Sequence, residues 1–415
     1  MNVLLHTFGC KANQYDTEVI RQRLEDAGCR IVPSAEEADA AVVNSCTVTH
    51  VGEAKMRGLV RRLARQRPGL RTVVMGCAAA LDTGRIAALP GVAAVVGGAD
   101  AARVAEALGV GGAPQSVLRG FSDSSRAWLK IQDGCDEHCT FCATTLARGD
   151  NRSRDPETLV AEARALAARH AEIVLTGVHI GTYGCERPGG TTLSRLAARL
   201  IEAVPEVRFR LSSVEATEVD ELLERLMAEA PDRLAPHLHA PLQSGSDRVL
   251  KRMGRHWYTA GAYRRRIERL AGRVRPLGLG ADIIVGFPGE TDADHRATTT
   301  LVEALPFTYL HVFPYSPREG TAAPRYGAPP APELVRERSA ELRALARRKA
   351  AAHRAARVGE TADLVLEARQ AGVRGALTED YLPVQVPADG AWVLGQARVR
   401  GRLLPRGGGL GAEAA

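Results

Sequence analysis

Short runs of β-branched residues alternate with helical patterns along most of this chain, and that alternation restricts its fold more than any other feature. In the first part, the runs NVLLHT, AVVNS, TVVMG and VAAVVGG precede helices expected at residues 14–27, 53–67, after Asp82 and at 101–108. Strands that alternate with helices predict a parallel sheet covered by helices, here an α/β domain over residues 1–114. The segment GVGGAPQS is the expected linker after it.

A second series of strands and helices follows. Its strand candidates are RAWLKIQ, EIVLTG, VRFRLSS, HLHAP, GLGADIIVGF and YLHVFPY. Six strand–helix units are too few for a closed barrel, which takes eight strands and ~250 residues. We therefore expect an open, partial barrel over residues 121–350. Asp155 followed by Pro156 predicts the start of its first helix, because the pair suits an N-cap and a first turn.

The pattern changes again near the end of the chain. After APPAPE, a helix rich in Ala and Arg is expected at residues 333–357, and TADLVLEAR, LPVQVP and WVLGQARVRGRLL predict strands. They predict a small all-β module over residues 357–407. The tail PRGGGLGAEAA is expected to be disordered.

Composition and charge narrow the class of protein. Hydrophobic residues make up 45% of the chain and charged residues 25%, which is typical of globular proteins. No apolar run reaches the roughly 18 residues of a membrane span, and the N-terminus lacks signal-peptide features, so we expect a cytoplasmic protein with no membrane partner. The net charge of +7 fits an anionic partner such as RNA, although an Arg-rich, Ala-rich composition produces the same balance.

Three of the 8 cysteines, Cys135, Cys139 and Cys142, lie together in GCDEHCTFC after the first strand of the second series. Cytoplasmic thiols stay reduced, so this clustering favours metal binding or catalysis over disulfides. A structural zinc site takes four ligands, usually as two CxxC pairs, and no partner pair lies nearby. A 4Fe-4S cluster bound by three thiolates instead leaves one iron open to a substrate.

Three other cysteines, Cys10, Cys46 and Cys77, each follow a predicted strand of the first domain. The carboxyl ends of parallel strands converge on the edge where such sheets bind ligands, so we expect these thiols to meet and hold a second cluster with an open iron. Buried cysteines that act as small hydrophobic residues are the alternative. Cys29 is expected in the core, and Cys185 has no assigned role.

Together these motifs resemble the methylthiotransferases of the radical SAM superfamily, whose signature is CxxxCxxC with an aromatic residue, here Phe141, before the third cysteine. TFGCKANQYDTE, NSCTVT and MGC resemble the N-terminal motifs, while GCDEHCTFC, ARG, RSR and HLHAPLQSGSDRVLKRM resemble the core. The resemblance implies a flavodoxin-like first domain, a partial TIM-like barrel of six βα units, and a TRAM-like module that binds tRNA. Ala143, Thr144 and Thr145 depart from the usual two aliphatic residues and proline.

The resemblance also implies cofactors and chemistry. Two 4Fe-4S clusters would be bound by the two cysteine sets. One molecule of S-adenosyl-L-methionine would methylate a sulfur at the first cluster, and a second would be cleaved at the other to a 5'-deoxyadenosyl radical that abstracts the hydrogen from C2 of adenine. An electron donor such as flavodoxin or ferredoxin and a sulfur donor would be partners.

The substrate implied by GCKxNQYDTE is N6-threonylcarbamoyladenosine at position 37, in the anticodon stem-loop of tRNA. A branch acting on isopentenyladenosine and a branch acting on a ribosomal protein, which typically has Pro where Lys11 stands, are the alternatives. From a different class, a non-catalytic metal-binding RNA-binding protein is also possible.

Two further groups of residues are candidates for binding. Glycines allow a ligand to approach the backbone closely, and carboxylates accept hydrogen bonds from ammonium groups or ribose hydroxyls. Alternatively, Ser212 is a helix cap and Glu215 is a charge at the start of a helix, which explains these two residues equally well. The candidates for S-adenosylmethionine are Thr176, Gly177, Ser212, Glu215 and Gly286. Alternating arginines share one strand face and suit phosphates, with a solvated face as the alternative. The candidates for tRNA are Arg398, Arg400 and Arg402.

Overall fold

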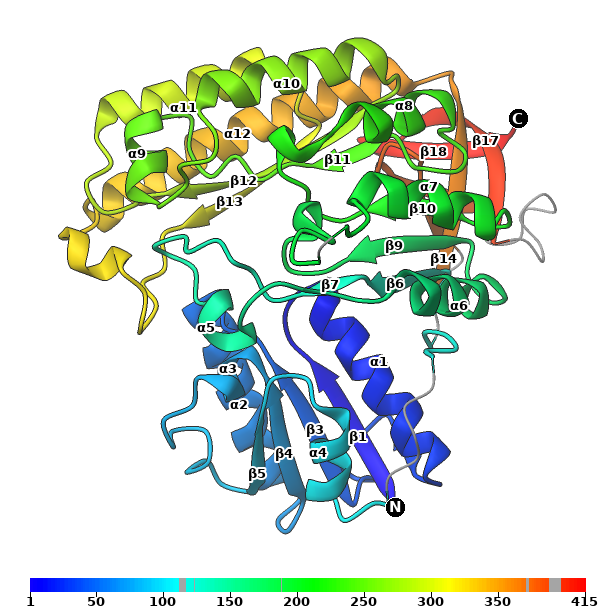
Figure 1. Ribbon diagram of the computed structural model, residues 1–415, viewed down its shortest axis with the longest axis vertical. Coiled ribbons are helices and arrows are strands. Elements are labelled where there is room, and N and C mark those ends of the chain that lie inside the picture. The colour runs from blue at the N-terminus through cyan, green and yellow to red at the C-terminus, as the bar shows by residue number, and fades with distance from the viewer. Residues whose placement is uncertain (112–116, 123, 188, 371–372, 388–396) are drawn as a thin grey trace.

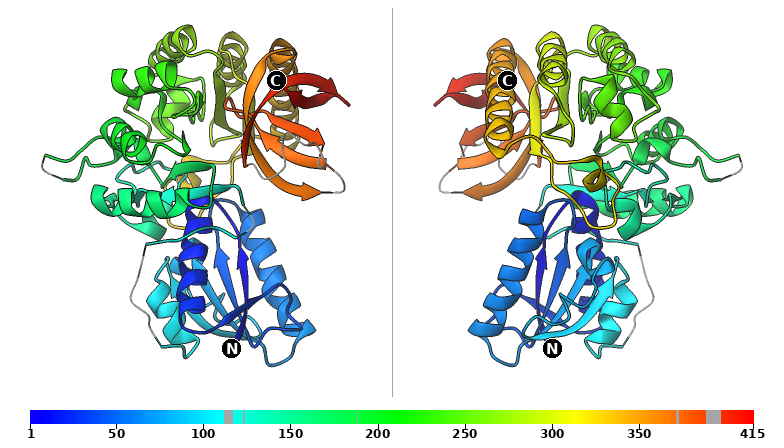
Figure 2. Two further views of the ribbon diagram at one scale, coloured as in Figure 1. Left: turned by 90° about the vertical axis from the view of Figure 1, so that its right-hand side faces the viewer. Right: turned by 90° about the vertical axis from the view of Figure 1, so that its left-hand side faces the viewer.

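The computed structural model of this protein describes residues 1–111, 117–122, 124–187, 189–370, 373–387 and 397–415 (Figure 1). The N-terminal sheet lies below a larger α/β core, and a small β-barrel packs against the side of that core (Figures 1 and 2). Most of the predicted linker at 109–116 lies outside the described residues. No helix in the described part of the chain is both long and apolar enough to cross a membrane.

The N-terminal domain is the predicted parallel sheet with helices on both faces, in the strand order β2-β1-β3-β4-β5. Its valines and alanines alternate between two hydrophobic layers, one under α1 and α4 and one under α2. The elements are β1 (Asn2–Thr7), α1 (Lys11–Asp26), β2 (Arg30–Val32), β3 (Ala40–Ser45), α2 (His50–Gln66), β4 (Arg71–Gly76), α3 (Cys77–Ala80), β5 (Val92–Gly97) and α4 (Ala101–Ala107). Cys29 lies in the core, as expected.

Two local details of this domain differ from expectation. The edge strand β2 was not predicted, because three residues are too few to show a period. The helix predicted after Asp82 is wrong, since residues 82–90 form turns. There the Asp82 carboxylate accepts hydrogen bonds from the backbone N–H groups of Ile86 and Ala87, and Gly84 has a φ of +97° that a helix does not allow.

The core is the predicted open barrel. Two parallel three-stranded sheets, β6-β9-β10 and β11-β12-β13, meet through a bridge between Ser213 and His239. Along β12, Leu279, Ala281 and Ile283 pack outward against the helices, so the residues that alternate with them face the barrel interior. The strands are β6 (Arg126–Lys130), β9 (Glu172–Thr176), β10 (Arg208–Leu211), β11 (His237–His239), β12 (Gly278–Val285) and β13 (Tyr309–Pro314).

The outer layer of the core consists of helices with capped ends. Asp155 caps α6 as predicted, since its side chain accepts a hydrogen bond from the N–H of Thr158, and Pro156 occupies the first turn. The helices are α6 (Pro156–Ala167), α7 (Leu193–Ala203), α8 (Glu221–Glu229), α9 (Asp247–Arg252), α10 (Ala260–Arg273), α11 (Asp292–Ala304) and α12 (Pro332–Arg357). Short elements near the cysteines are β7 (Gln132–Asp133), α5 (Thr144–Arg148) and β8 (Arg152–Ser153).

The C-terminal module is a closed barrel in the order β14-β15-β16-β18-β17. Its strands are β14 (Thr361–Gln370), β15 (Val373–Leu377), β16 (Pro383–Pro387), β17 (Arg398–Arg406) and β18 (Gly409–Ala414). The expectation of a disordered tail is wrong, because Gly409–Ala414 pairs with both β17 and β16. Gly407 and Gly408 turn the chain with positive φ angles, and Leu410 and Ala412 point into the barrel core.

A buried ion cluster joins this barrel to the core. The Glu172 carboxylate accepts hydrogen bonds from Arg208 (2.7 Å) and Arg210 (2.8 Å), and all three side chains are inaccessible to solvent. The Arg210 guanidinium also donates to the backbone oxygens of Thr378 and Glu379 in the barrel. The charges of the core therefore fix the position of the barrel.

Candidate active site between two cysteine sets

The three cysteines of the N-terminal domain converge at the carboxyl edge of its sheet. Cys10, Cys46 and Cys77 follow β1, β3 and β4, and the amide oxygen of Asn13 lies 4.0 Å from Cys10 Sγ and 3.8 Å from Cys77 Sγ. A Cβ atom placed on Gly9, whose φ is +108°, would lie 3.1 Å from Cys46 Sγ, so glycine admits that sulfur. The juxtaposition predicted for these thiols is present.

Arg148 connects this set to the core. It is the last residue of α5, and its Nε lies 3.2 Å from Cys77 Sγ. The same guanidinium donates to Asn13 (2.6 Å) and Asp16 (2.9 Å) of the N-terminal domain and to Asp133 (2.8 Å) of the core. Burial raises the pKa of the Cys77 thiol to about 11, and the Arg148 charge opposes that shift. Arg148 therefore favours a thiolate at Cys77.

The second set, Cys135, Cys139 and Cys142, lies on the loop between β7 and α5, at the carboxyl end of the barrel. Neighbouring groups contact each sulfur. His179 Nδ1 lies 3.6 Å from Cys135 Sγ, Arg255 Nη1 donates to Cys139 Sγ at 3.5 Å, and the Thr144 hydroxyl lies 3.1 Å from Cys142 Sγ. Burial raises the pKa of the Cys139 thiol to about 12, and the Arg255 charge opposes that shift.

These three cysteines line a cavity of about 170 Å³ together with Glu215, Arg255 and Trp257. Glu215 is buried and pairs with Arg255 through Oε1, while its Oε2 has no hydrogen-bond partner among the described residues. Burial raises the pKa of the Glu215 carboxyl, and the Arg255 charge opposes that shift. An unpaired carboxylate oxygen on a cavity wall fits a ligand with ammonium or hydroxyl donors.

A second cavity, of about 180 Å³, lies between the two domains. Residues 47–49, which follow Cys46, form its N-terminal side, and Asp282, Phe313 and Arg318 belong to its core side. Phe141, Cys142, Thr144 and Gln243 line both cavities. The cavity of the second cysteine set therefore shares a wall with a cavity lined by the residues that follow Cys46 of the first set.

The other candidates for S-adenosylmethionine have different surroundings. Val178 and Ser213, the neighbours of Gly177 and Ser212, line the cysteine cavity, whereas Thr176, Gly177, Ser212 and Gly286 are not among its lining residues. Gly286 lies against α12, since a Cβ there would lie 2.6 Å from Val335 Cγ2. Only Glu215 of the five belongs to the cavity wall; a role for the others stays a prediction.

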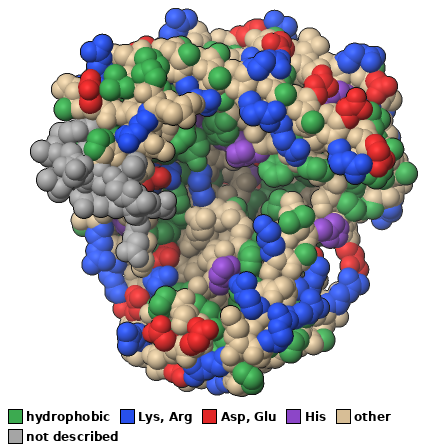
Figure 3. Space-filling view, turned by 180° about the vertical axis from the view of Figure 1, so that it is seen from behind, with side chains coloured by type: hydrophobic (Ala, Val, Ile, Leu, Met, Phe, Trp, Pro, Cys, Tyr) green, Lys and Arg blue, Asp and Glu red, His purple; other side chains and the backbone are tan. Residues whose placement is uncertain are grey.

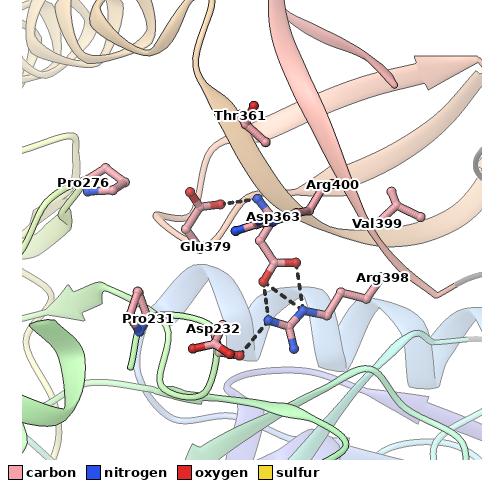
Figure 4. A pocket seen from close by; sticks show the side chains of 9 residues that line it. All are labelled: Pro231, Asp232, Pro276, Thr361, Asp363, Glu379, Arg398, Val399 and Arg400. Atoms are coloured by element: carbon pink, nitrogen blue, oxygen red, sulfur yellow. Dashed lines mark hydrogen bonds and ion pairs between the residues drawn. The ribbon is translucent and has the colours of Figure 1, made fainter. Parts of the chain in front are cut away.

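The three arginines of β17 lie on its outer face, while Val399 and Leu403 between and beyond them are buried. Arg398 is not free, because its Nε donates to Asp363 (2.8 Å) and its Nη2 to the backbone oxygen of Asp232 (2.6 Å), as Figure 4 shows. Arg400 and Arg402 are exposed. Arg400 and Arg398 line a polar cavity of about 660 Å³ where the barrel meets the core.

Polar side chains that the sequence did not single out line the barrel interior. His239 Nε2 and His311 Nδ1 lie 3.1 and 3.2 Å from the same Asp282 oxygen, and the Tyr309 hydroxyl lies 3.1 Å from His239 and 2.8 Å from His237. The ligand atoms of His239, Asp282 and His311 all lie within 4.8 Å of one another, close enough to hold a metal ion. The sequence signal for these residues was the alternation of polar with apolar side chains, His237 and His239 along β11 and Tyr309 and His311 along β13.

Both cysteine sets fit cubane clusters with an open iron. Each has three thiols, and the remaining cysteines are elsewhere, Cys29 in the core and Cys185 exposed. Each set also has a buried cation beside a sulfur, Arg148 or Arg255, which stabilises thiolate charge. Arg148 and Arg255 are functional candidates that sequence reasoning missed, although Arg148 belongs to the ARG motif.

Comparison with known proteins agrees with this geometry. Residues 2–98 match a family described as "Uncharacterized protein family UPF0004", and residues 129–302 match the radical SAM superfamily. The chain is 40% identical to the Bacillus subtilis threonylcarbamoyladenosine tRNA methylthiotransferase MtaB, over 78% of this chain and 75% of that protein. It is 33% identical to the Thermus thermophilus tRNA-2-methylthio-N(6)-dimethylallyladenosine synthase, over 96% and 89%.

Among solved structures, the radical S-adenosylmethionine methyltransferase TsrM from Kitasatospora setae shares the fold, with a TM-score of 0.58, 16% identity, and coverage of 75% of this chain and 72% of that one. The superfamily match implies S-adenosyl-L-methionine and 4Fe-4S clusters as cofactors. The matches cover both cysteine-bearing domains, and the similarity to MtaB extends over most of the chain. The chain therefore belongs to the radical SAM methylthiotransferase family, on the branch of the threonylcarbamoyladenosine tRNA methylthiotransferases.

Proposed function

We propose that this protein adds a methylthio group to C2 of N6-threonylcarbamoyladenosine at tRNA position 37, giving 2-methylthio-N6-threonylcarbamoyladenosine. One observation carries the proposal: the cavity lined by the second set of three thiols shares a wall with a cavity lined by the residues that follow Cys46 of the first set. The substrate is the one named for the similar proteins from Bacillus subtilis and Thermotoga maritima. A transfer between two centres needs this arrangement, because the acceptor has to reach both.

The bound clusters and S-adenosyl-L-methionine would supply the sulfur, the methyl group and the radical that opens the C2–H bond, which offers no acidic proton to a base. Within the protein, Glu215 would accept hydrogen bonds from S-adenosylmethionine through its unpaired oxygen while Arg255 holds the carboxylate in place. Arg255 is itself positioned by the Tyr258 hydroxyl, 2.9 Å from its Nε. Phe141 and Trp257 on the same wall would exclude water from the radical.

The remaining partners follow from the same proposal. Arg400 and Arg402 on the exposed face of β17 would contact phosphates of the anticodon stem-loop. An electron donor such as flavodoxin or ferredoxin would reduce the clusters, and a sulfur donor would replace the sulfur consumed in each turnover. All these partners belong to the cytoplasm, where we propose that the protein acts.

An isopentenyladenosine substrate is the second candidate, since the relative from Thermus thermophilus is named for a dimethylallyl product. The polar row His239, Asp282 and His311 in the barrel interior favours the threonylcarbamoyl substituent instead. An isopentenyl group has no hydrogen-bonding atoms and could make no polar contact with these side chains beyond those they make to one another.

The decisive experiment uses protein reconstituted without oxygen, dithionite, S-adenosylmethionine and a synthetic anticodon stem-loop that carries N6-threonylcarbamoyladenosine. Mass spectrometry should detect the methylthio product. Cys139→Ala should abolish cleavage of S-adenosylmethionine, whereas Cys46→Ala should keep cleavage and lose methylthiolation. Cys185→Ser is the matched control and should behave as wild type. Methylthiolation by the Cys46→Ala protein, or no product from wild type with both clusters loaded, contradicts the proposal.

A further inference from the structure

Lys11 is a cation without an anionic partner at the interface between the N-terminal domain and the barrel. It is the first residue of α1 and directly follows Cys10. Its side chain is partly buried, and its Nζ lies 5.8 Å from the centre of the Trp128 ring on β6. Within the described part of the chain, no carboxylate lies within ion-pair distance of it. A partly buried ammonium group in this position is available to an anionic ligand.

Trp128 shows that Lys11 faces the barrel interior. Along β6, Ala127 and Leu129 are buried in the core cluster under the helices. The residues that alternate with them, including Trp128, therefore point toward the interior. Lys11 thus lies on the interior wall of the barrel, one residue from a sulfur that we assign to the first cluster.

The arginines of the interior near Lys11 have carboxylate partners, whereas Lys11 has none in the part of the chain that the structure describes. Glu172 pairs with Arg208 and Arg210, Arg208 also pairs with Asp363 of the small barrel (3.2 Å), and Arg126 on β6 pairs with Glu367 (2.8 Å). The neighbours that act electrostatically on Lys11 are mainly cations, with Glu172 as the acidic exception among the core residues. Because the interior arginines are already paired and Lys11 has no carboxylate within ion-pair distance among the described residues, the Lys11 ammonium group favours a ligand with a negative charge.

A row of polar groups leads from the cavity between the domains into this interior. Asp282 lines that cavity, and hydrogen-bonded contacts run from His311 and Asp282 through His239 to Tyr309. Gly280 leaves room for the row, because a Cβ there would lie 2.0 Å from the Tyr309 ring. Figure 3 shows the molecule hollowed between the core and the N-terminal domain, with histidine side chains around the hollow.

We propose that Lys11 binds the carboxylate of the N6-threonylcarbamoyl substituent and that the row from Tyr309 to His311 offers polar contacts to the rest of that group. The inference rests on the proposed function, since it takes C2 of the adenine to lie between the two cysteine sets. The substituent is then directed into the barrel interior, where Lys11 has no carboxylate within ion-pair distance among the residues that the structure describes. Lys11 thereby distinguishes a substrate with a carboxylate from one with an unmodified or isopentenylated adenine.

The test measures binding of three synthetic anticodon stem-loops to protein with both clusters loaded. One carries N6-threonylcarbamoyladenosine, one its carboxylate methyl ester, and one unmodified adenosine. Wild type should bind the first RNA roughly tenfold to hundredfold more tightly than the ester, as for a hydrogen bond to a charged group. Lys11→Met should bind the two equally, with its affinity for unmodified RNA unchanged. Lys11→Arg should keep most of the preference.

Three controls separate this inference from other outcomes. Lys55→Met, the same change at an exposed lysine of this domain, should behave as wild type. Iron content and cleavage of S-adenosylmethionine without RNA should be unchanged in Lys11→Met, which shows that the cluster beside Cys10 is intact. Equal loss of affinity for all three RNAs would mean that Lys11 contacts the RNA backbone and would overturn the inference.

The failure of each proposal gives a different result. If wild type methylthiolates the modified RNA and Lys11→Met still prefers the carboxylate over the ester, the carboxylate site is wrong while the function stands. If wild type forms no product from the modified RNA and does not distinguish it from unmodified RNA, the proposed substrate is wrong and the inference falls with it.

Discussion

Thr144 shows how one residue adapts a cluster site. It belongs to the three residues, 143–145, that depart from the family pattern after the third cysteine, and its hydroxyl and backbone N–H lie 3.1 and 3.4 Å from Cys142 Sγ. When Cys142 is a cluster-bound thiolate, the hydroxyl can donate to it. Hydrogen bonds to cluster sulfurs stabilise the reduced, more negative state and so raise the reduction potential.

We expect Thr144→Val to make the reduction potential of the second cluster more negative, on the order of tens of millivolts. A redox titration followed by electron paramagnetic resonance measures this. Thr145→Val is the matched control, because Thr145 lines the same cavity with no described contact to a cysteine sulfur. An unchanged potential in Thr144→Val would show that the hydroxyl does not bond to the thiolate.

We expect Glu215→Gln to weaken binding of S-adenosylmethionine, because the variant loses the negative charge beside the ligand's donors. The loss should be roughly tenfold to hundredfold in Kd, the range for a hydrogen bond to a charged group. Equilibrium binding to the reconstituted protein measures it, and an unchanged cluster spectrum shows that the cysteine loop is intact. Glu221→Gln, the same change at an exposed side chain of α8 outside the cavity lining, is the comparison. Wild-type affinity in Glu215→Gln would remove this residue from the site.

At the scale of elements, the sequence predicted the strands and helices that show a regular hydrophobic period. It missed the short strand β2 and the strand β18, which closes the small barrel. The sheet, the six-stranded open barrel and the meeting of Cys10, Cys46 and Cys77 follow from alternation and from the geometry of parallel strand ends. Strand β18 could not be predicted, since its glycines have no strand propensity and it forms only because β16 and β17 need a partner to close the barrel. Arg148 and Arg255 could not be predicted either, because each reaches a cysteine sulfur through contacts with residues that are distant in the sequence.

The arginine face of β17 carries a prediction for this element. Arg400→Gln should weaken tRNA binding and lower the slope of log affinity against log salt by about 1, the effect of one phosphate contact. Filter binding at several salt concentrations measures it. Arg398→Gln should instead lower thermal stability, because Arg398 is ion-paired with Asp363. If the slope of log affinity against log salt is the same in Arg400→Gln and in wild type, Arg400 makes no phosphate contact and this face of β17 is simply solvated.

At the scale of the whole molecule, buried charges fix the small barrel to the core. Burial opposes ionisation of Glu172, but Arg210 and Arg208 outweigh it and hold the pKa of that carboxyl below its ordinary value. A carboxyl with a depressed folded-state pKa stabilises the protein above the unfolded value, about 4.3 for glutamate, and that stabilisation is lost as pH falls below it. The attachment of the barrel should therefore weaken in acid.

Glu172→Gln should lower the free energy of unfolding by about 3–5 kcal/mol near neutral pH, because two buried guanidiniums lose their carboxylate. The gap in melting temperature between wild type and variant should stay constant down to about pH 5 and narrow below about pH 4, because the unfolded wild-type carboxyl takes up a proton there while the folded one stays ionised. Calorimetry at each pH measures both. Glu367→Gln, at a more exposed pair with Arg126, should show a much smaller effect. If the difference in melting temperature does not depend on pH, the charge of the Glu172 carboxylate does not stabilise the attachment of the barrel.

Arg148 has a consequence for the RNA. One guanidinium contacts Cys77, Asn13 and Asp16 on one side and Asp133 on the other, so Arg148 holds the two domains together beside the cavity between them. For the adenine to enter this cavity, we expect the nucleotide to rotate out of the stack of its loop, at a cost of a few kcal/mol. Anticodon loops in which this nucleotide is already unstacked should bind at a lower free-energy cost. We therefore expect the enzyme to select RNA by the deformability of its loop as well as by the chemistry of its base.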